Sequence, residues 1–210
     1  MPRIALLIAL VFLAAVWQRA RAVSDAPSLP PRTVLNVDLE GDGPREKIVL
    51  DARRDPALEV WRGGKRLDGN VPRRWRPWKL LLADVDGDGR RDIIVGVYKA
   101  TRFFKQPHNC VFVYNWDGRR ITPKWLGSSL AKPFSDFTFA NIDSDRADEL
   151  VALETLRDGK KCIVVYSWIG FGFAPDWQRG AWTNAKIVSA VGNQVLVEAD
   201  GKRLNVKLLR

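Results

Sequence analysis

The chain has 210 residues, of which 46% are hydrophobic and 28% charged, and its formal net charge is +10 at pH 7. This composition excludes a disordered or low-complexity chain and allows one globular domain with a sizeable core. One histidine and two cysteines are too few for a zinc cluster built from these residue types.

The first 22 residues have the pattern of a secretory signal peptide. A positively charged start precedes the apolar run Ile4–Trp17, and Ala20–Ala22 fits the small-x-small cleavage pattern. We therefore predict a secreted, extracytoplasmic protein, periplasmic or at the cell surface, with a linker over residues 23–32. The apolar run is short for a membrane span, and an uncleaved anchor is the alternative. No membrane span is expected in the mature chain.

From residue 33 onward the sequence repeats a unit of about fifty residues. Cys110–Trp116 and Cys162–Trp168 read CVFVYNW and CIVVYSW. Each unit holds an acidic loop between two apolar runs, a third run, a glycine turn and a fourth run. Three such units are followed by three strand-like runs over residues 186–208 that have no acidic loop. Four short strands in a unit of this length are typical of a β-propeller blade.

We therefore predict an all-β fold over residues 33–210, a small β-propeller of about four blades with an incomplete fourth blade. An N-terminal segment could supply the missing strand and close the ring, and closure by pairing of two chains is the alternative. The two cysteines are predicted to be free and buried, because equivalent sites of neighbouring units are too far apart for a disulfide. Trp61, Trp116 and Trp168 are predicted to be equivalent packing residues.

The three acidic loops carry the oxygen ligands of a calcium site. In the second loop, carboxylates stand at the first, third, fifth and ninth positions, and the seventh offers a main-chain carbonyl. The loop is not an EF-hand, because its twelfth position is the strand residue Val95. The predicted ligand positions are Asp84, Asp86, Asp88, Arg90 and Asp92 in the second loop, Asn141, Asp143, Asp145 and Glu149 in the third, and Asp38, Glu40, Asp42 and Glu46 in the first.

The pattern D-x-D-G-D-G-x-x-D resembles the loops of the FG-GAP/VCBS repeat family, and the resemblance covers roughly residues 33–182. It implies calcium-binding loops between propeller strands, as in integrin alpha subunits. The second loop matches at every ligand position. The other two depart from the pattern at Glu40, Pro44 and Glu46, and at Asn141, Arg146 and Glu149. We expect one strong Ca²⁺ site and up to two weaker ones, and the alternative is turns that need no metal.

Two segments combine basic and aromatic residues outside the repeat pattern. One is Arg73–Trp78, and the other is Lys99–Asn109, an insertion in the second unit that reads KATRFFKQPHN. Aromatic faces bind sugars and cations, and arginines pair with carboxylates or phosphates. The alternative is that one of the two phenylalanines packs beneath its own loop. The predicted ligand-binding residues are Trp75, Arg74, Arg102, Phe103, Phe104 and Lys105.

No catalytic residues are predicted. The single histidine, His108, lies in the inserted loop, and most acidic residues belong to the acidic loops. We expect a non-catalytic binding or scaffold module for a polysaccharide, another cell-surface polymer or a protein partner. Two carboxylates suffice for a glycosidase, and Glu154 could be one, so a carbohydrate- or lipid-active hydrolase or lyase is the alternative. Nucleic acid is not expected as a partner, given export and the acidic loops.

Overall fold

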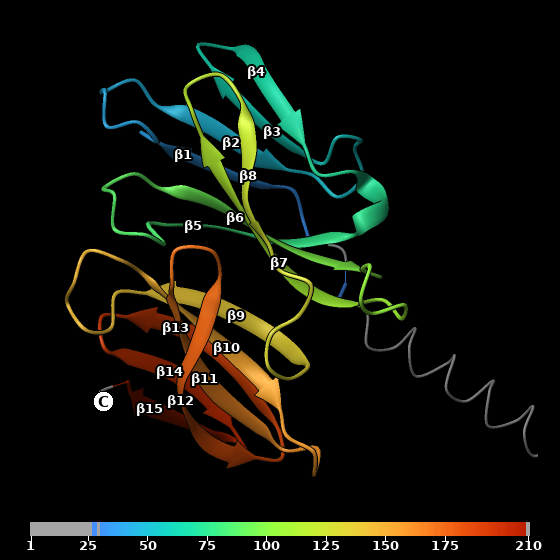
Figure 1. Ribbon diagram of the computed structural model, residues 1–210, viewed down its shortest axis with the longest axis vertical. Coiled ribbons are helices and arrows are strands. Elements are labelled where there is room, and N and C mark those ends of the chain that lie inside the picture. Colours follow the sequence, from blue (N-terminus) through green and yellow to red (C-terminus); the bar gives the residue numbers. More distant parts are fainter. Residues whose placement is uncertain (1–26, 29, 209–210) are drawn as a thin grey trace, which may run out of the picture.

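The structure is a computed structural model that describes residues 27–28 and 30–208. The signal peptide predicted for residues 1–22 lies outside the described residues. The described part is all-β, as predicted, and its strands form four antiparallel sheets that follow one another along the chain (Figure 1).

The sheets have four, four, four and three strands, each in chain order. The first contains β1 (Thr33–Val37), β2 (Glu46–Leu50), β3 (Leu58–Arg62) and β4 (Lys65–Asn70). The second contains β5 (Pro77–Ala83), β6 (Asp92–Lys99), β7 (His108–Trp116) and β8 (Ile121–Leu126). The third contains β9 (Phe134–Ala140), β10 (Glu149–Thr155), β11 (Lys161–Trp168) and β12 (Phe173–Trp182). The fourth contains β13 (Ala185–Val191), β14 (Gln194–Ala199) and β15 (Lys202–Lys207). A 3-10 turn, η1 (Arg73–Trp75), joins the first two sheets.

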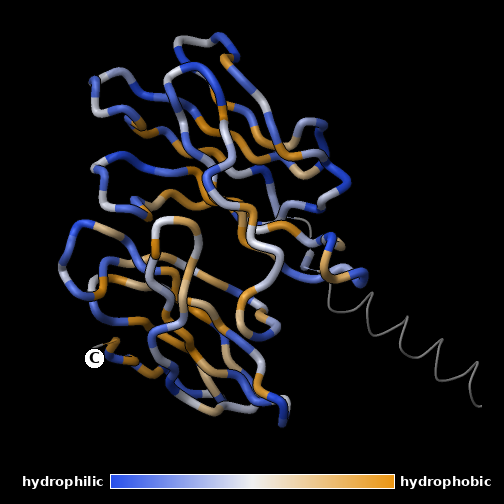
Figure 2. Tube along the Cα trace, viewed as in Figure 1, coloured by the Kyte–Doolittle hydropathy of each residue, from blue (hydrophilic) through white to orange (hydrophobic). Residues whose placement is uncertain are grey.

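The core consists of three apolar layers, each between two consecutive sheets. In β6, Ile93 and Val95 belong to the first layer and Ile94 to the second, because successive side chains alternate between the two faces of a strand. A Cβ on Gly96 would lie 2.9 Å from a ring carbon of Phe137, so glycine permits the close approach of the second and third sheets. Figure 2 shows apolar residues along the strands and hydrophilic ones in the loops at both edges.

The four units and the three-stranded last sheet agree with the sequence prediction. The described residues form no closed ring, because their apolar clusters join only consecutive sheets.

Charged side chains cover the outer faces of the two end sheets. Glu59 pairs with Arg66 at 3.3 Å on the first sheet, and Lys186 with Glu198 at 3.2 Å on the fourth. Polar outer faces are what terminal units of a stack require.

The loops gather at two opposite edges (Figure 1). The three acidic loops, which join β1 to β2, β5 to β6 and β9 to β10, lie along one edge, at the left of the view. We call this the acidic edge. The β2–β3 and β6–β7 loops and η1 lie along the other edge. We call the basic side chains of η1, Arg76 and the Lys99–Lys105 segment the basic edge.

Strand register corrects the expected equivalence of the tryptophans. Trp61 pairs with the second residue of β2, and that position of β6 and β10 pairs with Tyr114 and Tyr166. Trp61 is therefore equivalent to these two tyrosines and not to the tryptophans that end β7 and β11. Cys110 and Cys162 are free and buried, as predicted, and belong to different apolar layers.

Candidate functional site

The three acidic loops share one frame, in which carboxylates accept hydrogen bonds from the main chain. The ninth residue of each loop begins the second strand of its sheet and is buried. It accepts a hydrogen bond from the N–H of the second loop residue, at 2.9 Å for Glu46, 3.4 Å for Asp92 and 2.8 Å for Glu149. Asp38 and Asp84 each accept the N–H of the sixth residue at 2.8 Å. The loops are therefore preformed turns with one buried acid each.

The buried acid of the first loop is paired with an arginine. The guanidinium of Arg62, the last residue of β3, bonds to both Glu40 and Glu46 and lies 3.7 Å from Asp42. Hydrogen bonds to Glu40 and Glu46 raise the pKa of Arg62, so it stays charged. A guanidinium thus lies among the carboxylates that were predicted to bind calcium.

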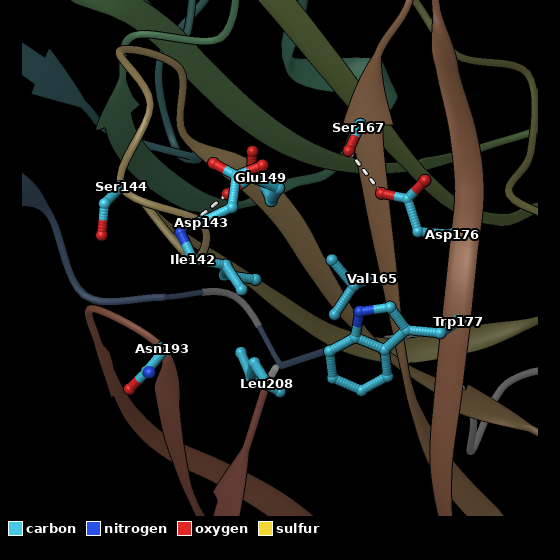
Figure 3. Close-up of a pocket in the computed structure, with 10 residues that line it drawn as sticks. All are labelled: Ile142, Asp143, Ser144, Glu149, Val165, Ser167, Asp176, Trp177, Asn193 and Leu208. Atoms are coloured by element: carbon cyan, nitrogen blue, oxygen red, sulfur yellow. Dashed lines mark hydrogen bonds between the residues drawn. The ribbon is translucent and has the colours of Figure 1, made fainter. Parts of the chain in front are cut away.

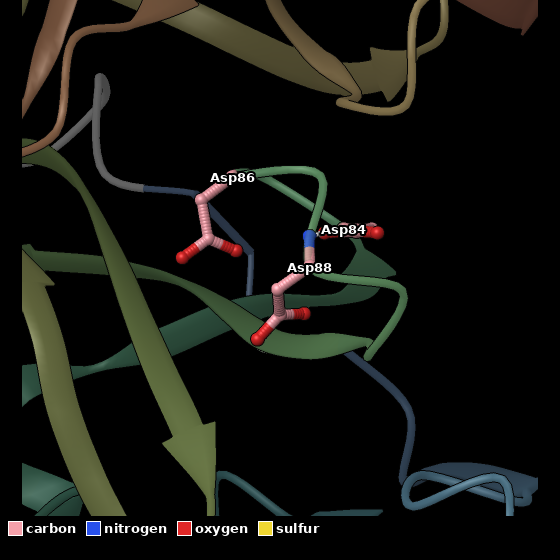
Figure 4. A group of neighbouring side chains, drawn as sticks. All are labelled: Asp84, Asp86 and Asp88. Atoms are coloured by element: carbon pink, nitrogen blue, oxygen red, sulfur yellow. Dashed lines mark hydrogen bonds between the residues drawn. The ribbon is translucent and has the colours of Figure 1, made fainter.

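The second loop gathers three carboxylates from a single turn, those of Asp84, Asp86 and Asp88 (Figure 4). One oxygen from each lies within 4.8 Å of the others, close enough to share a cation. The main chain of Arg90, the fourth predicted ligand position, donates a hydrogen bond to Asp88 at 2.8 Å.

A lysine pairs with two acids of the second loop, Asp86 of the gathered group and the buried Asp92. The ammonium of Lys124, in β8, lies 2.9 Å from both Asp86 and the buried Asp92. Burial raises the pKa of Asp92 to about 6, although the hydrogen bond from Lys124 opposes this shift. Burial lowers the pKa of Lys124, but its bonds to the two aspartates outweigh that effect and raise it. The pair is therefore ionised at neutral pH.

The third loop has three gathered carboxylates, and none of them forms an ion pair among the described residues. Oxygens of Asp143, Asp145 and Glu149 lie within 4.8 Å of one another. Burial and the neighbouring charges of Asp143 and Asp145 raise the pKa of Glu149 to about 7. Asn141, a fourth predicted ligand, instead donates its side-chain amide to the main-chain oxygen of Asp145.

Strand equivalence explains why no strand residue supplies a paired cation to the acids of the third loop, although Arg146 lies within the loop itself. Ser167 follows Tyr166 as Arg62 follows Trp61, and Asp176 stands between proline and tryptophan as Lys124 does. Both cationic positions are thus lost in the third unit. The hydroxyl of Ser167 donates a hydrogen bond to Asp176.

These residues line a cavity of about 290 Å³ between the third loop and the fourth sheet. Figure 3 shows Asp143 and Glu149 on one side, Ser167 and Asp176 on the other, and the apolar side chains of Trp177 and Leu208 beside them. The third loop is anchored on the second, because the N–H of Asp148 donates to the main-chain oxygen of Asp84 at 2.7 Å. The cavity offers carboxylate oxygens, which are ligands for a hard cation.

The aromatic residues predicted to bind a ligand divide into two groups. Trp75 is half-buried, packs edge-on against Phe112 at 5.5 Å between ring centroids and contacts the first apolar layer. Phe103 and Phe104 are 74% and 49% exposed, so packing beneath the loop is wrong for Phe103, while Phe104 lies against His108.

The basic residues predicted with them, Arg74, Arg102 and Lys105, are all exposed. The loop that carries the two phenylalanines is a closed turn, because the N–H of Thr101 donates to the main-chain oxygen of Phe104 at 2.8 Å. Trp75 packs against Phe112 and so belongs to the first apolar layer. The exposed aromatic surface consists of Phe103 and Phe104 at the tip of the loop.

The sequence analysis did not identify Arg62 and Lys124, the two cations that pair with acids of the first and second loops. The repeat offset that relates Pro123 to Pro175 also relates Lys124 to Asp176, so this exchange was visible in the sequence. No repeat pattern in the sequence indicated that Arg62 pairs with the acids of the first loop. Glu154, the acid considered for catalysis, is fully buried and bonds to the hydroxyl of Tyr166 and, at 3.3 Å, to Lys132.

No family model and no curated protein matches this chain. Within residues 27–28 and 30–208, no helix is long and apolar enough to cross a membrane.

Proposed function

We propose that the protein is a secreted, calcium-stabilised β-propeller-like module of the FG-GAP/VCBS type that acts as a non-catalytic binding protein for an anionic component of the cell surface. The observation that carries this proposal is the separation of charge between the two edges. The three acidic loops along one edge hold twelve acidic and four basic residues, whereas exposed basic side chains and aromatic rings predominate along the other edge. The four sheets are its blades, and the fourth has three strands.

We assign the calcium site to the third loop rather than to the second. Glu149 is buried beside two exposed carboxylates, those of Asp143 and Asp145, and none of the three pairs with a cation among the described residues, so a divalent ion would remove their repulsion. Asp143, Asp145 and Glu149 would hold the ion, with Asp176 close by in the same cavity. In the first two loops, Arg62 and Lys124 already supply positive charge. In the second loop Asp84 is half-buried and Asp86 already pairs with Lys124, so we propose that this loop is the weaker site.

The basic edge supplies the binding surface. Arg73, Arg74, Arg102 and Lys105 are exposed, and none pairs with an acidic side chain among the described residues. By contrast, Arg62, Lys124 and Lys132 are engaged in ion pairs. Unpaired cations on one edge favour an anionic ligand, and the acidic loops on the other edge orient the molecule toward it.

The hydrolase alternative would use the cavity of the third loop. It combines a carboxyl of raised pKa, Glu149, with a second acid, Asp143, and an aromatic wall, Trp177. Hydrolysis of a polysaccharide that Glu149→Gln abolishes would support the enzyme instead.

The test of binding uses residues 23–210, polygalacturonate as an anionic polymer and dextran as a neutral one. We expect retention on polygalacturonate that weakens with salt and with the double variant Arg74→Glu/Arg102→Glu. The matched control is Arg203→Glu/Lys207→Glu, which changes the net charge equally on the exposed face of β15. Retention on dextran that survives high salt, or equal losses in both double variants, would contradict the proposal.

A further inference from the structure

We infer that the anionic component is a lipid bilayer, and that Phe103 and Phe104 enter its headgroup region while the surrounding cations pair with lipid phosphates. This inference rests on the proposed function of the basic edge and names its ligand.

The aromatic tip is the first observation. Phe103 is 74% exposed and Phe104 49% exposed, side by side on one loop. The turn between Thr101 and Phe104 holds the tip through two hydrogen bonds, of 2.8 Å and 3.2 Å. Phenylalanine rings have no hydrogen-bonding group, so exposure to water gains them nothing. Rings of this kind bind at the boundary between headgroups and acyl chains.

The cations around the tip are the second observation. Arg102 and Lys105 flank the two rings directly, and Arg73 and Arg74 of η1 lie on the same edge. Lys99, at the start of the Lys99–Lys105 segment, connects this segment to η1, because its ammonium lies 5.1 Å from the centroid of the Trp75 ring. Basic side chains beside exposed aromatics are the arrangement that recognises anionic membranes.

A vesicle flotation experiment with residues 23–210 tests the inference. Phosphatidylcholine vesicles with and without phosphatidylglycerol serve as probes, and polygalacturonate serves as a soluble polyanion. Of the two kinds of vesicle, we expect the protein to bind only those that contain phosphatidylglycerol, and we expect this binding to weaken with salt. Replacing both cations in Arg102→Gln/Lys105→Gln should weaken vesicle binding roughly 30-fold. Phe103→Ser/Phe104→Ser should weaken vesicle binding strongly and leave polygalacturonate binding unchanged.

Phe171→Ser is the matched control, because Phe171 is 80% exposed on a different turn, between β11 and β12. Vesicle binding that Phe103→Ser/Phe104→Ser leaves intact would overturn the inference. Binding to polygalacturonate without binding to vesicles would overturn it too, while the proposed function would survive. Binding to neither probe would overturn both. The melting temperature of each variant shows whether it has kept its fold.

Discussion

Replacing Glu149 with glutamine is expected to change stability in opposite directions with and without calcium. Burial, helped by the charges of Asp143 and Asp145, raises the pKa of this carboxyl from 4.5 to about 7. Below pH 4.5, Glu149 is protonated in both the folded and the unfolded chain. Between the two values only the unfolded chain loses its proton, so the stability of the calcium-free protein falls as pH rises. Above about pH 7, the free energy of unfolding has fallen by about 3 kcal/mol.

Glutamine keeps the shape of Glu149 and its acceptor for the N–H of Ile142, but it carries no charge. At about pH 8 in EDTA, Glu149→Gln should therefore be more stable than the wild type by up to about 3 kcal/mol. In calcium this advantage should disappear, because only the wild type retains the full ligand set. Urea unfolding followed by tryptophan fluorescence measures both states.

Glu46→Gln is the matched control, because Glu46 occupies the equivalent position in the first loop and is paired with Arg62. This variant should be destabilised with or without calcium. If Glu149→Gln were destabilised in EDTA to the same extent as Glu46→Gln, the reasoning from an uncompensated buried acid would be refuted. A wild type whose stability in EDTA is the same at about pH 5 and pH 8 would refute it equally.

Four further substitutions test the packing and the charge pairs. Lys124→Ala should lower the free energy of unfolding by about 2 kcal/mol in EDTA. The effect is smaller than for a fully buried pair, because Lys124 is partly exposed. Calcium should restore part of the lost stability. Lys186→Ala, in an exposed pair, should change urea unfolding by less than about 0.5 kcal/mol. Gly96→Ala should lower the melting temperature and cost about 1–3 kcal/mol, because its Cβ would meet Phe137. Asp176→Lys should raise the melting temperature in EDTA and abolish its response to calcium, and a preserved response would contradict the assignment.

Most of the fold could be predicted from the sequence, because its signals are local. Alternating and continuous apolar runs marked the strands, and the repeat of Cys110–Trp116 at Cys162–Trp168 marked the units. Strand register was harder to predict. The expected equivalence of Trp61 with Trp116 relied on residue type, whereas pairing with β2 decides its position. Ring closure depends on contacts between distant units, and the sequence contains no pattern for such contacts.

The acidic loops were visible in the sequence, but the charge balance on which we base the proposed ranking of their calcium sites was not. The match of Asp84–Asp92 to a calcium pattern made the second loop the expected strong site. The charge balance of each loop depends on side chains from strands that follow it by 16 residues or more, Arg62 beside Glu46 and Lys124 beside Asp92. A pattern read within one loop cannot include those cations. The sequence marked Lys99–Asn109 as an insertion outside the repeat, but it left open whether Phe103 is exposed or packs beneath the loop, and the structure shows it exposed.

Calcium binding measured by isothermal titration calorimetry on three proteins, the wild type and two double variants, tests the central claim most directly. The variants are Asp145→Asn/Glu149→Gln in the third loop and Asp86→Asn/Asp88→Asn in the second. We predict that the wild type binds calcium tightly at a single site, that the third-loop variant loses this binding, and that the second-loop variant retains it. Tight binding that survives in the third-loop variant and is lost in the second-loop variant would contradict the account.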